Sequence, residues 1–350
     1  MNQPFDLQNF SLSPDSGALA LEATLAQLLV PGNIMDAQLE GVCRRLQQRF
    51  DIYCSTSPSP LWHRGGIITT EARCQSEIYL PITEIQAAFR SLLLRSCRYH
   101  PFYPAAPLFS SPSWIDALER ILPFSLELNP ASIILRGARD ERFRRELLYA
   151  LFVPLRFGGS HNRYPGQKGF LGDWLSRHRG EKRLSLDAGC GTGEGVYEIA
   201  EMAAESGVDA EIHGCTIEPL ELAAAAHGWF PGDCEREIEA EGLIAKLNCG
   251  SRIRFFRDDI CNLSDRGDRY DVVICNGLLG GPLLHKKSAL EAAVSKLGRV
   301  IKKEGMILAA DRFHDGWHKI IPASMLENIL KTHGFRVIAV PEGVGAIRTE

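Results

Sequence analysis

The stretch LSLDAGCGTGEG, which begins at Leu184, has the residue types and spacing of a ligand-binding turn. An apolar run leads into Asp187. Glycine then occupies alternate positions, at Gly189, Gly191 and Gly193. Glycine has no Cβ, so the backbone here can turn sharply and lie close to a ligand. We expect the next helix to begin at about Glu194, because its free amide groups would then point into the same space.

The charge of Glu194 separates two kinds of ligand. A dinucleotide-binding loop has the pattern Gly-x-Gly-x-x-Gly, and counted from Gly189 its last glycine would fall at position 194. A carboxylate at that position would repel a pyrophosphate but attract a cationic ligand. S-adenosylmethionine fits, since it has no phosphate and carries a sulfonium and an ammonium group. The alternative interpretation is a plain tight turn that binds nothing.

An acidic residue is expected where the second apolar run, AEIHGCTI, comes to an end. In nucleotide-binding α/β folds an acid after this strand hydrogen-bonds the ribose hydroxyls. Thr216 occupies its usual position, and Glu218 lies two residues on, on the same side of an extended chain. We therefore expect Glu218 to bind the ribose. Alternatively, Glu218 only starts the next helix beside Pro219.

The next two strand ends complete the expected donor site. FFRDDI closes the third strand, where Asp259 could accept the adenine amino proton and Ile260 could lie beside the ring. Asn276 and Gly277 close the fourth strand, where we expect the methyl group. The donor-binding residues expected from the sequence are Asp187, Gly189, Cys190, Gly191, Thr192, Gly193, Glu194, Thr216, Glu218, Asp259, Ile260, Asn276 and Gly277.

The elements that must position these residues follow from the hydrophobic pattern. From about residue 180, short apolar runs alternate with helical stretches, which predicts a mostly parallel sheet with helices on both faces. We expect an α/β fold with a Rossmann-like, seven-stranded sheet over residues 154–350 and a ligand at the carboxyl ends of its strands. For residues 1–153 the hydrophobic pattern predicts a mainly helical domain, which we expect to cap the site or hold the substrate. The helices expected there are 17–30, 36–50, 83–98, 113–122 and 131–152.

These motifs resemble class I S-adenosylmethionine-dependent methyltransferases, and most of all the chemotaxis-receptor glutamate methyltransferases of the CheR type. That family's loop reads Gly-x-Ser-Thr-Gly-Glu-x-x-Tyr-x-x-Ala, which is similar to residues 189–200. Its Asp-Ile-Asp-Pro resembles residues 216–219, and its Gly-Ile-Tyr-Pro resembles residues 228–231. Its Thr-x-Phe-Phe-Arg segment is similar to residues 160–164, so the resemblance gives Arg163 a place against the donor and its methyl group.

The resemblance covers about residues 160–340 and departs from the family at one strand end. The family's Cys-Arg-Asn-Val-Leu-Ile-Tyr-Phe is replaced here by CNGLLGGP at residues 275–282. The resemblance implies S-adenosylmethionine as cofactor and a protein carboxylate as methyl acceptor. The altered stretch leaves a small-molecule acceptor, or a module that binds the donor without turnover, as alternatives.

Methyl transfer from a sulfonium requires positioning and exclusion of water more than acid–base chemistry. A carboxylate acceptor is ionised at neutral pH and needs no general base, and no convincing base triad is evident. We expect Arg163, Asn276 and His314 to be the catalytic residues. His314 and His318 could share a helix face, but no third ligand accompanies them, so we expect no metal.

Composition excludes several other classes of protein. The 350 residues carry a net charge of −4 and a pI near 6.2, which argues against a nucleic-acid partner. No apolar run reaches the roughly 18 residues of a membrane span, and the N-terminus lacks the pattern of a signal peptide. Ten cysteines occur without a Cys-x-x-Cys pair, as expected for reduced thiols. We therefore expect a cytoplasmic enzyme.

The stretch RGARDERFRR, residues 136–145, combines five arginines with interleaved acids. It could be a basic patch for an acidic partner. We favour a solvated helix face whose charges pair with one another.

Overall fold

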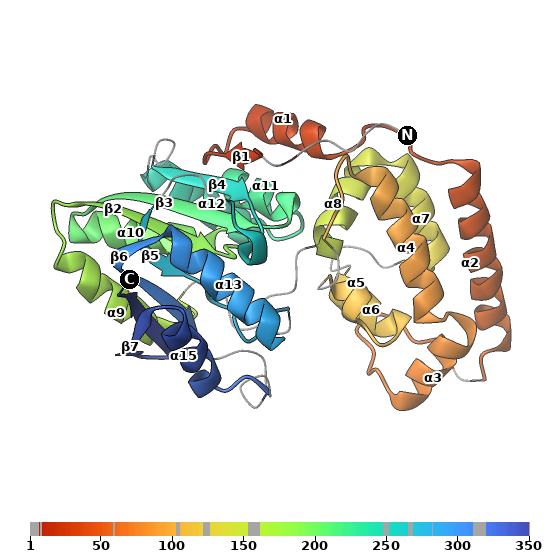
Figure 1. The fold of residues 1–350 in the computed structure, drawn as a ribbon. Helices are drawn as coiled ribbons and strands as arrows, with labels where there is room; N and C mark the ends of the chain where they lie inside the picture. Colours follow the sequence, from red (N-terminus) through yellow and green to blue (C-terminus); the bar gives the residue numbers. More distant parts are fainter. Residues whose placement is uncertain are drawn as a thin grey trace. The chain divides into compact units, whose positions relative to one another are not determined.

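A computed structural model of the protein (Figure 1) describes residues 7, 9–58, 60–102, 106–121, 127–152, 162–247, 252–264, 269–281, 283–310 and 320–349. The chain divides into two compact units. One, which we call the helical unit, comprises Met1–Asp6, Glu22–Leu155 and Phe230–Glu237. The other, the sheet unit, comprises Leu7–Leu21, Arg156–Trp229 and Ile238–Glu350. The functions expected of the two regions remain predictions.

The sheet unit contains one sheet whose strands follow the order β1-β4-β3-β2-β5-β6-β8-β7. The strands are β1 Ser11–Leu12, β2 Lys182–Ala188, β3 Asp209–Thr216, β4 Ile253–Arg257, β5 Tyr270–Ile274, β6 Ile301–Ala310, β7 Phe335–Val340 and β8 Gly343–Arg348. Strands β4, β3, β2, β5 and β6 are parallel, whereas β1 and β8 pair antiparallel with their neighbours. The predicted α/β class with a mostly parallel, Rossmann-like sheet is confirmed.

The described sheet has eight strands where the sequence predicted seven. The additional strand is β1, which has two residues and pairs with Phe255 and Phe256 of β4. A strand this short has no alternating pattern of its own, because period-two alternation needs at least four residues to be visible. The eighth strand therefore had no sequence signal.

The order of winding reverses beside β2, and this places the predicted ligand edge. The chain runs from β2 outward through β3 to β4, then returns to the other side of β2 with β5. At the end of β2, Asp187 lies opposite Gly214 of β3 and Ile274 of β5. Ligands of open α/β sheets bind outside the carboxyl ends of strands at this kind of switch point.

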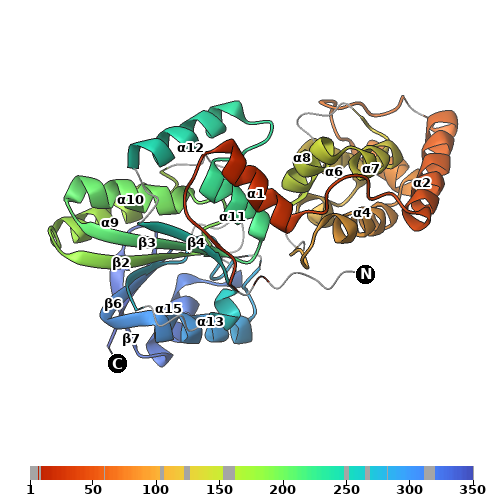
Figure 2. The same cartoon turned by 90° about the horizontal axis from the view of Figure 1, so that it is seen from above.

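Helices cover both faces of the sheet (Figure 2). On one face lie α9, α10 and α11, and on the other lie α13 and α15. The bounds are α9 Pro165–Ser176, α10 Glu194–Ser206, α11 Pro219–His227, α12 Cys234–Leu247, η2 Ile260–Asn262, α13 Lys287–Val300 and α15 Ala323–Thr332. Buried apolar residues of α13 and α15, such as Val294 and Ile329, form one core with Leu186 and Val273 of the sheet. This burial supplies the main stabilisation of the unit.

The helical unit contains short helices around a second apolar core. They are α2 Ala37–Thr56, α3 Thr70–Tyr79, α4 Ile82–Ser96, α5 Pro107–Ser110, α6 Trp114–Ile121, α7 Pro130–Arg139 and α8 Glu141–Phe152, together with most of α1 Ala18–Leu28. The expected helix 131–152 is two helices, because Asp140 is extended and ends α7. Its side chain then accepts a hydrogen bond from Phe143 N and begins α8.

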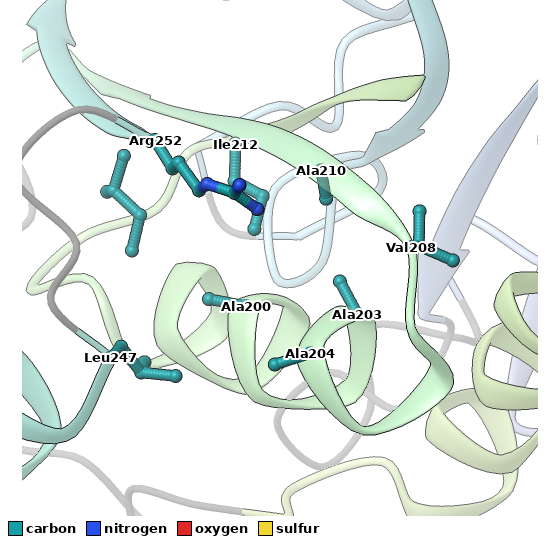
Figure 3. Close-up of a pocket in the computed structure, with 9 residues that line it drawn as sticks. Ala200, Ala203, Ala204, Val208, Ala210, Ile212, Leu247 and Arg252 are labelled. Carbon is teal, nitrogen blue, oxygen red and sulfur yellow. The ribbon is translucent and has the colours of Figure 1, made fainter. Parts of the chain in front are cut away.

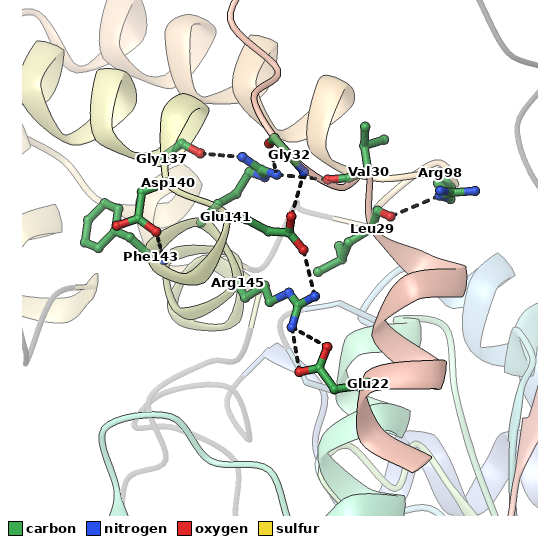
Figure 4. Close-up of polar contacts among 11 residues, drawn as sticks. Glu22, Leu29, Val30, Gly32, Arg98, Gly137, Asp140, Glu141, Phe143 and Arg145 are labelled. Carbon is green, nitrogen blue, oxygen red and sulfur yellow. Dashed lines mark hydrogen bonds and ion pairs between the residues drawn. The ribbon is translucent and has the colours of Figure 1, made fainter. Parts of the chain in front are cut away.

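The arginine stretch is divided between surface and core (Figure 4). Arg145 pairs with Glu22 and Glu141, so the predicted charge pairing is confirmed at this position. Arg144 is only 1% exposed, and so the solvated-face interpretation was wrong for it. It donates hydrogen bonds to the carbonyls of Val30, at 2.9 Å, and Gly32, at 2.6 Å. A second guanidinium nitrogen donates to two carbonyls of α7. The Arg144 side chain therefore connects the segment after α1 with α7 and α8.

Candidate donor-binding site

The turn after β2 has the conformation that its glycines predicted. Gly189, Gly191 and Gly193 all have positive φ, at 91°, 53° and 90°. The backbone N–H groups of Gly189 and Cys190 donate to the Cys215 carbonyl, at 2.8 and 3.0 Å, which fixes the turn to the end of β3. Residues with a Cβ rarely adopt this backbone.

Part of the need for glycine comes from packing within the protein itself. A Cβ on Gly189 would overlap Cδ1 of Leu278 and lie 3.0 Å from its Cγ. A Cβ on Gly193 would lie 2.8 Å from the Cβ of Ala225 in α11. At two of the three positions, packing of neighbouring side chains therefore excludes a Cβ, whether or not a ligand is bound.

Helix α10 begins at Glu194, as predicted, and the Glu194 side chain is buried with 6% exposure. Its two carboxylate oxygens accept the Thr192 hydroxyl, at distances of 3.0 and 2.9 Å. A carboxylate is favoured here by the amide groups of the helix N-terminus. It adds a buried negative charge beside the glycine turn.

Asp187 brings a second carboxylate to the same helix end. It is 7% exposed, and a Cβ on Gly195 would lie 2.5 Å from its Oδ2. The carboxylate therefore lies directly against the first turn of α10, where only glycine leaves room for it. The sequence analysis assigned no role to Gly195, although it continues the alternation of glycines.

The end of β3 presents two acids, which make different contacts. Glu218 is the N-cap of α11, and its side chain accepts a hydrogen bond from Leu220 N at 3.2 Å. Glu221 accepts the Thr216 hydroxyl at 2.6 Å. Glu221 was not among the predicted residues, because its position in the first turn of a helix is also typical of an ordinary helix acid.

The Cys190 thiol is buried beside acidic residues. Burial raises its pKa, and the negative charges of Asp187, Glu221 and Glu194 raise it further. Burial likewise raises the pKa of Cys275, so both thiols are neutral at physiological pH.

The third strand end places its predicted residues in different environments. Asp259 is exposed and caps η2 by accepting a hydrogen bond from Cys261 N at 2.9 Å. Ile260 is 6% exposed and packs in the core cluster with α13. Asp258 is buried and accepts hydrogen bonds from the backbone and hydroxyl of Ser264. These contacts hold the loop after β4 in place.

At the end of β5, Asn276 connects three elements. Its Oδ1 accepts a hydrogen bond from Ala310 N of β6, and its Nδ2 donates to Oε1 of Gln167 in α9, both at 2.7 Å. Gly277 has φ 80°, and nothing lies within 4 Å of the position that its Cβ would take. Both polar atoms of Asn276 thus have partners within the protein.

The segment before α9 carries the predicted Arg163, which is exposed and lies 5.5 Å from the Tyr164 ring centroid. Gln167, two residues into the helix, is 4% exposed. Its Nε2 is buried and has no hydrogen-bond partner among the residues that the structure describes. Sequence reasoning missed Gln167 because one glutamine at a helix start carries no pattern. The predicted His314 lies outside the described residues, and its role stays a prediction.

The described pockets lie elsewhere. A cavity of about 250 Å³ is lined by alanines of α10, including Ala203, and by Val208 and Ile212 of β3 (Figure 3). These residues belong to the end of α10 and the start of β3, hence to the opposite edge of the sheet from the glycine turn. Among the described residues, no group of three or more His, Cys, Asp or Glu side chains could hold a metal ion.

Taken together, the described part of the turn fits a cationic ligand. Its glycines have positive φ, and the buried carboxylates of Asp187 and Glu194 lie beside it. The unpartnered amide nitrogen of Gln167 adds one hydrogen-bond donor. These acids would repel a pyrophosphate.

Comparisons with known proteins agree with this chemistry. Residues 181–330 match the family model described as a methyltransferase domain. No curated protein sequence matches the chain. Within the described helices, none is long and apolar enough to cross a membrane.

Several solved structures are similar to part of the chain. The TehB-like SAM-dependent methyltransferase from Corynebacterium glutamicum is 15% identical with a TM-score of 0.35, covering 63% of this chain and 100% of that one. The N-methyltransferase NodS from Bradyrhizobium japonicum is 14% identical with a TM-score of 0.36, covering 55% and 100%. The [4+2]-cyclase SpnF is 21% identical with a TM-score of 0.34, covering 49% of this chain and 57% of that one.

Proposed function

Residues 181–330 form a methyltransferase domain whose methyl donor is S-adenosylmethionine, and from this premise we propose that the whole chain methylates a carboxylate or a similar nucleophile. The observation that carries the donor site is the pair of buried carboxylates at the glycine turn, where Asp187 lies against the first turn of α10 and Glu194 accepts the Thr192 hydroxyl. Negative charge in a buried setting favours a ligand that carries a sulfonium and an ammonium.

Within this proposal, Glu221 is the stronger candidate for the ribose hydroxyls. The Thr216 hydroxyl donates to one of its carboxylate oxygens at 2.6 Å and so holds the carboxylate at the end of β3. Glu218, predicted for this role, has one oxygen engaged as the cap of α11. Both acids follow the strand where α/β enzymes bind ribose.

The proposed class of acceptor is supported by the titratable groups in three segments at the strand ends. Residues 187–194, 215–221 and 275–281, all described, contain carboxylates and thiols but no histidine or lysine. Burial raises the pKa of the thiols of Cys190 and Cys275, so neither is an effective base at neutral pH. A phenol or amine acceptor usually needs a base, whereas a carboxylate is already ionised. Together with the resemblance of residues 189–200 to CheR-type enzymes, this favours a carboxylate.

Donor binding is tested by calorimetry with S-adenosylhomocysteine. We expect binding to the wild-type chain, and weakening of about tenfold or more in Glu194→Gln and Glu221→Gln, since each removes a carboxylate charge from the proposed site. Glu205→Gln, on the exposed last turn of α10, is the matched control and should bind normally. Equal affinity in all four proteins would refute the site.

The acceptor is tested with tritiated S-adenosylmethionine and a panel of small carboxylic acids, acidic peptides, phenols and amines. Carboxyl methyl esters release volatile methanol in mild alkali, whereas phenolic ethers and N-methyl groups keep their label. We expect alkali-labile product from the carboxylates. Alkali-stable label on phenols or amines would show that the acceptor belongs to one of those classes and not to the carboxylates. Saturated donor binding without methyl transfer to any compound of the panel would mean that the protein binds the donor without turnover.

A further inference from the structure

We infer that Gln167 is a positioning residue of the donor site, and that its amide nitrogen holds the carboxylate at the methionine end of S-adenosylmethionine. This inference rests on the proposed donor binding and adds a contact that the glycine turn cannot make. Gln167 lies in the first turn of α9, a helix outside the strand ends that supply the other contacts.

The orientation of the Gln167 amide is fixed by a chain of hydrogen bonds. Ala310 N is a backbone donor, so the Asn276 atom that it meets at 2.7 Å must be the amide oxygen. The Nδ2 of Asn276 is therefore the atom facing Gln167, and the Gln167 atom 2.7 Å away must be its oxygen. The Nε2 of Gln167, with two N–H donors, is left on the other side.

That nitrogen is buried and lacks a partner among the described residues. Gln167 as a whole is 4% exposed, so solvent does not readily compensate. A buried amide without an acceptor is unfavourable, and such groups are rare in native proteins unless a ligand or water completes them. An oxygen-bearing ligand is the natural complement of an NH₂ group.

Two neighbouring elements fix the segment that carries Gln167. Glu342, in the turn between β7 and β8, accepts a hydrogen bond from Gly166 N at 2.7 Å. Glu198 of α10 accepts one from Asn162 N and lies 3.6 Å from the Lys168 ammonium. The site is thus held by contacts on both sides of Gln167, which is what a positioning residue requires.

The same contacts locate Gln167 relative to the charge of the turn. Glu198 follows Glu194 by one helical turn, so the two lie on the same face of α10. Asn276, its other neighbour, comes from the end of β5, the strand that pairs with β2 beside the turn. Gln167 is therefore bonded to the end of β5, where the methyl group is expected, and the segment around it is bonded to α10 one turn after Glu194.

The chemistry of the donor completes the assignment. Its methionine end has an ammonium and a carboxylate on one carbon. Glu194 suits the ammonium and would repel the carboxylate, so the carboxylate needs a separate hydrogen-bond donor. Nε2 of Gln167 supplies one without adding a charge. A carboxylate of the acceptor has the same chemistry and is the other source that the experiment must distinguish.

Calorimetry with two ligands separates these cases. One is S-adenosylhomocysteine, and the other is its decarboxylated analogue, which lacks only the carboxylate. We expect Gln167→Leu to weaken the first by about tenfold and the second by less than twofold. Gln167→Glu keeps the oxygen that Asn276 needs but places a negative charge beside the ligand, so it should weaken the first ligand more than Gln167→Leu does. Exposed Gln48→Leu is the control and should change neither.

Each remaining outcome counts against the inference in a different way. Equal weakening of both ligands by Gln167→Leu, with Gln167→Glu harmless, would mean a purely structural role. Unchanged donor affinity with a raised KM for a carboxylate acceptor would assign the amide to the acceptor instead. Failure of the wild-type chain to bind S-adenosylhomocysteine would overturn the proposed function and this inference together, whereas wild-type binding with normal Gln167 variants would overturn the inference alone.

Discussion

Replacing Gly189 by alanine tests how tightly the glycine turn is packed in the absence of any ligand. Gly189 has φ 91°, and an added Cβ would overlap Cδ1 of Leu278. The nearby Gly277 offers a matched control, because its φ is 80° and nothing lies within 4 Å of its Cβ position. Gly189→Ala thus suffers both backbone strain and a collision, whereas Gly277→Ala suffers only the strain.

The magnitudes follow from these two terms. A left-handed backbone costs an L-residue roughly 1–2 kcal/mol. Displacing the Leu278 side chain from a packed position costs about 1–3 kcal/mol more, since carbon atoms ordinarily stay about 3.5–4.0 Å apart. We therefore expect Gly189→Ala to lower the free energy of unfolding by about 2–5 kcal/mol and Gly277→Ala by about 1–2 kcal/mol.

Hydrogen–deuterium exchange of β2 and α10 measures this locally, because a chain with two compact units need not unfold in one step. Adding Leu278→Ala to Gly189→Ala should remove the collision but leave the backbone strain at residue 189. If Gly189→Ala exchanges no faster than Gly277→Ala, or if the Leu278 change shows no coupling with it, the described packing of the turn is wrong.

Three other substitutions probe the structure around the site. Asp271→Asn removes a buried carboxylate that accepts hydrogen bonds from Leu184 N, Lys302 and Arg183; burial alone would raise its pKa, but these contacts outweigh it and lower the pKa of Asp271. A carboxyl group whose pKa is lowered on folding stabilises the fold at pH values above its ordinary pKa, and this stabilisation is lost as the pH falls through the folded pKa. Urea denaturation should therefore show a lower free energy of unfolding for Asp271→Asn than for the wild type at pH 7, and the difference should shrink below about pH 4. Gly195→Ala places a Cβ 2.5 Å from the Asp187 carboxylate and should lower the Tm, although alanine has a helix propensity about 1 kcal/mol better than glycine. Gly172→Ala in α9 is the control, because nothing lies within 4 Å of its Cβ position, and it should raise the Tm. Arg144→Leu removes hydrogen bonds to four backbone carbonyls, of which Ala138 O keeps its bond from Ile34 N. It should destabilise the helical unit by about 3 kcal/mol or more, measured by hydrogen exchange. Exposed Arg142→Leu should have little effect, and equal protection in both variants would contradict the role of Arg144.

The sequence alone determined the fold class and the type of donor. A strand followed by alternating glycines needs no tertiary information to predict a sharp turn, because positive φ is a local property of glycine. Glu194 in place of the last fingerprint glycine was likewise a local fact, and its charge alone argued against a pyrophosphate. The alternation of apolar runs and helical stretches predicted the parallel sheet for the same reason.

Tertiary structure decided which polar groups meet. Gln167 and Asn276 are 109 positions apart, and only the packing of α9 against the end of β5 reveals that one orients the other. Glu218 and Glu221 look alike in sequence, yet one caps a helix and the other pairs with Thr216. Arg144 is buried among carbonyls from distant segments, although its neighbours in sequence form surface ion pairs. Such partners are set by chain topology, which brings residues together at distances that no local pattern encodes.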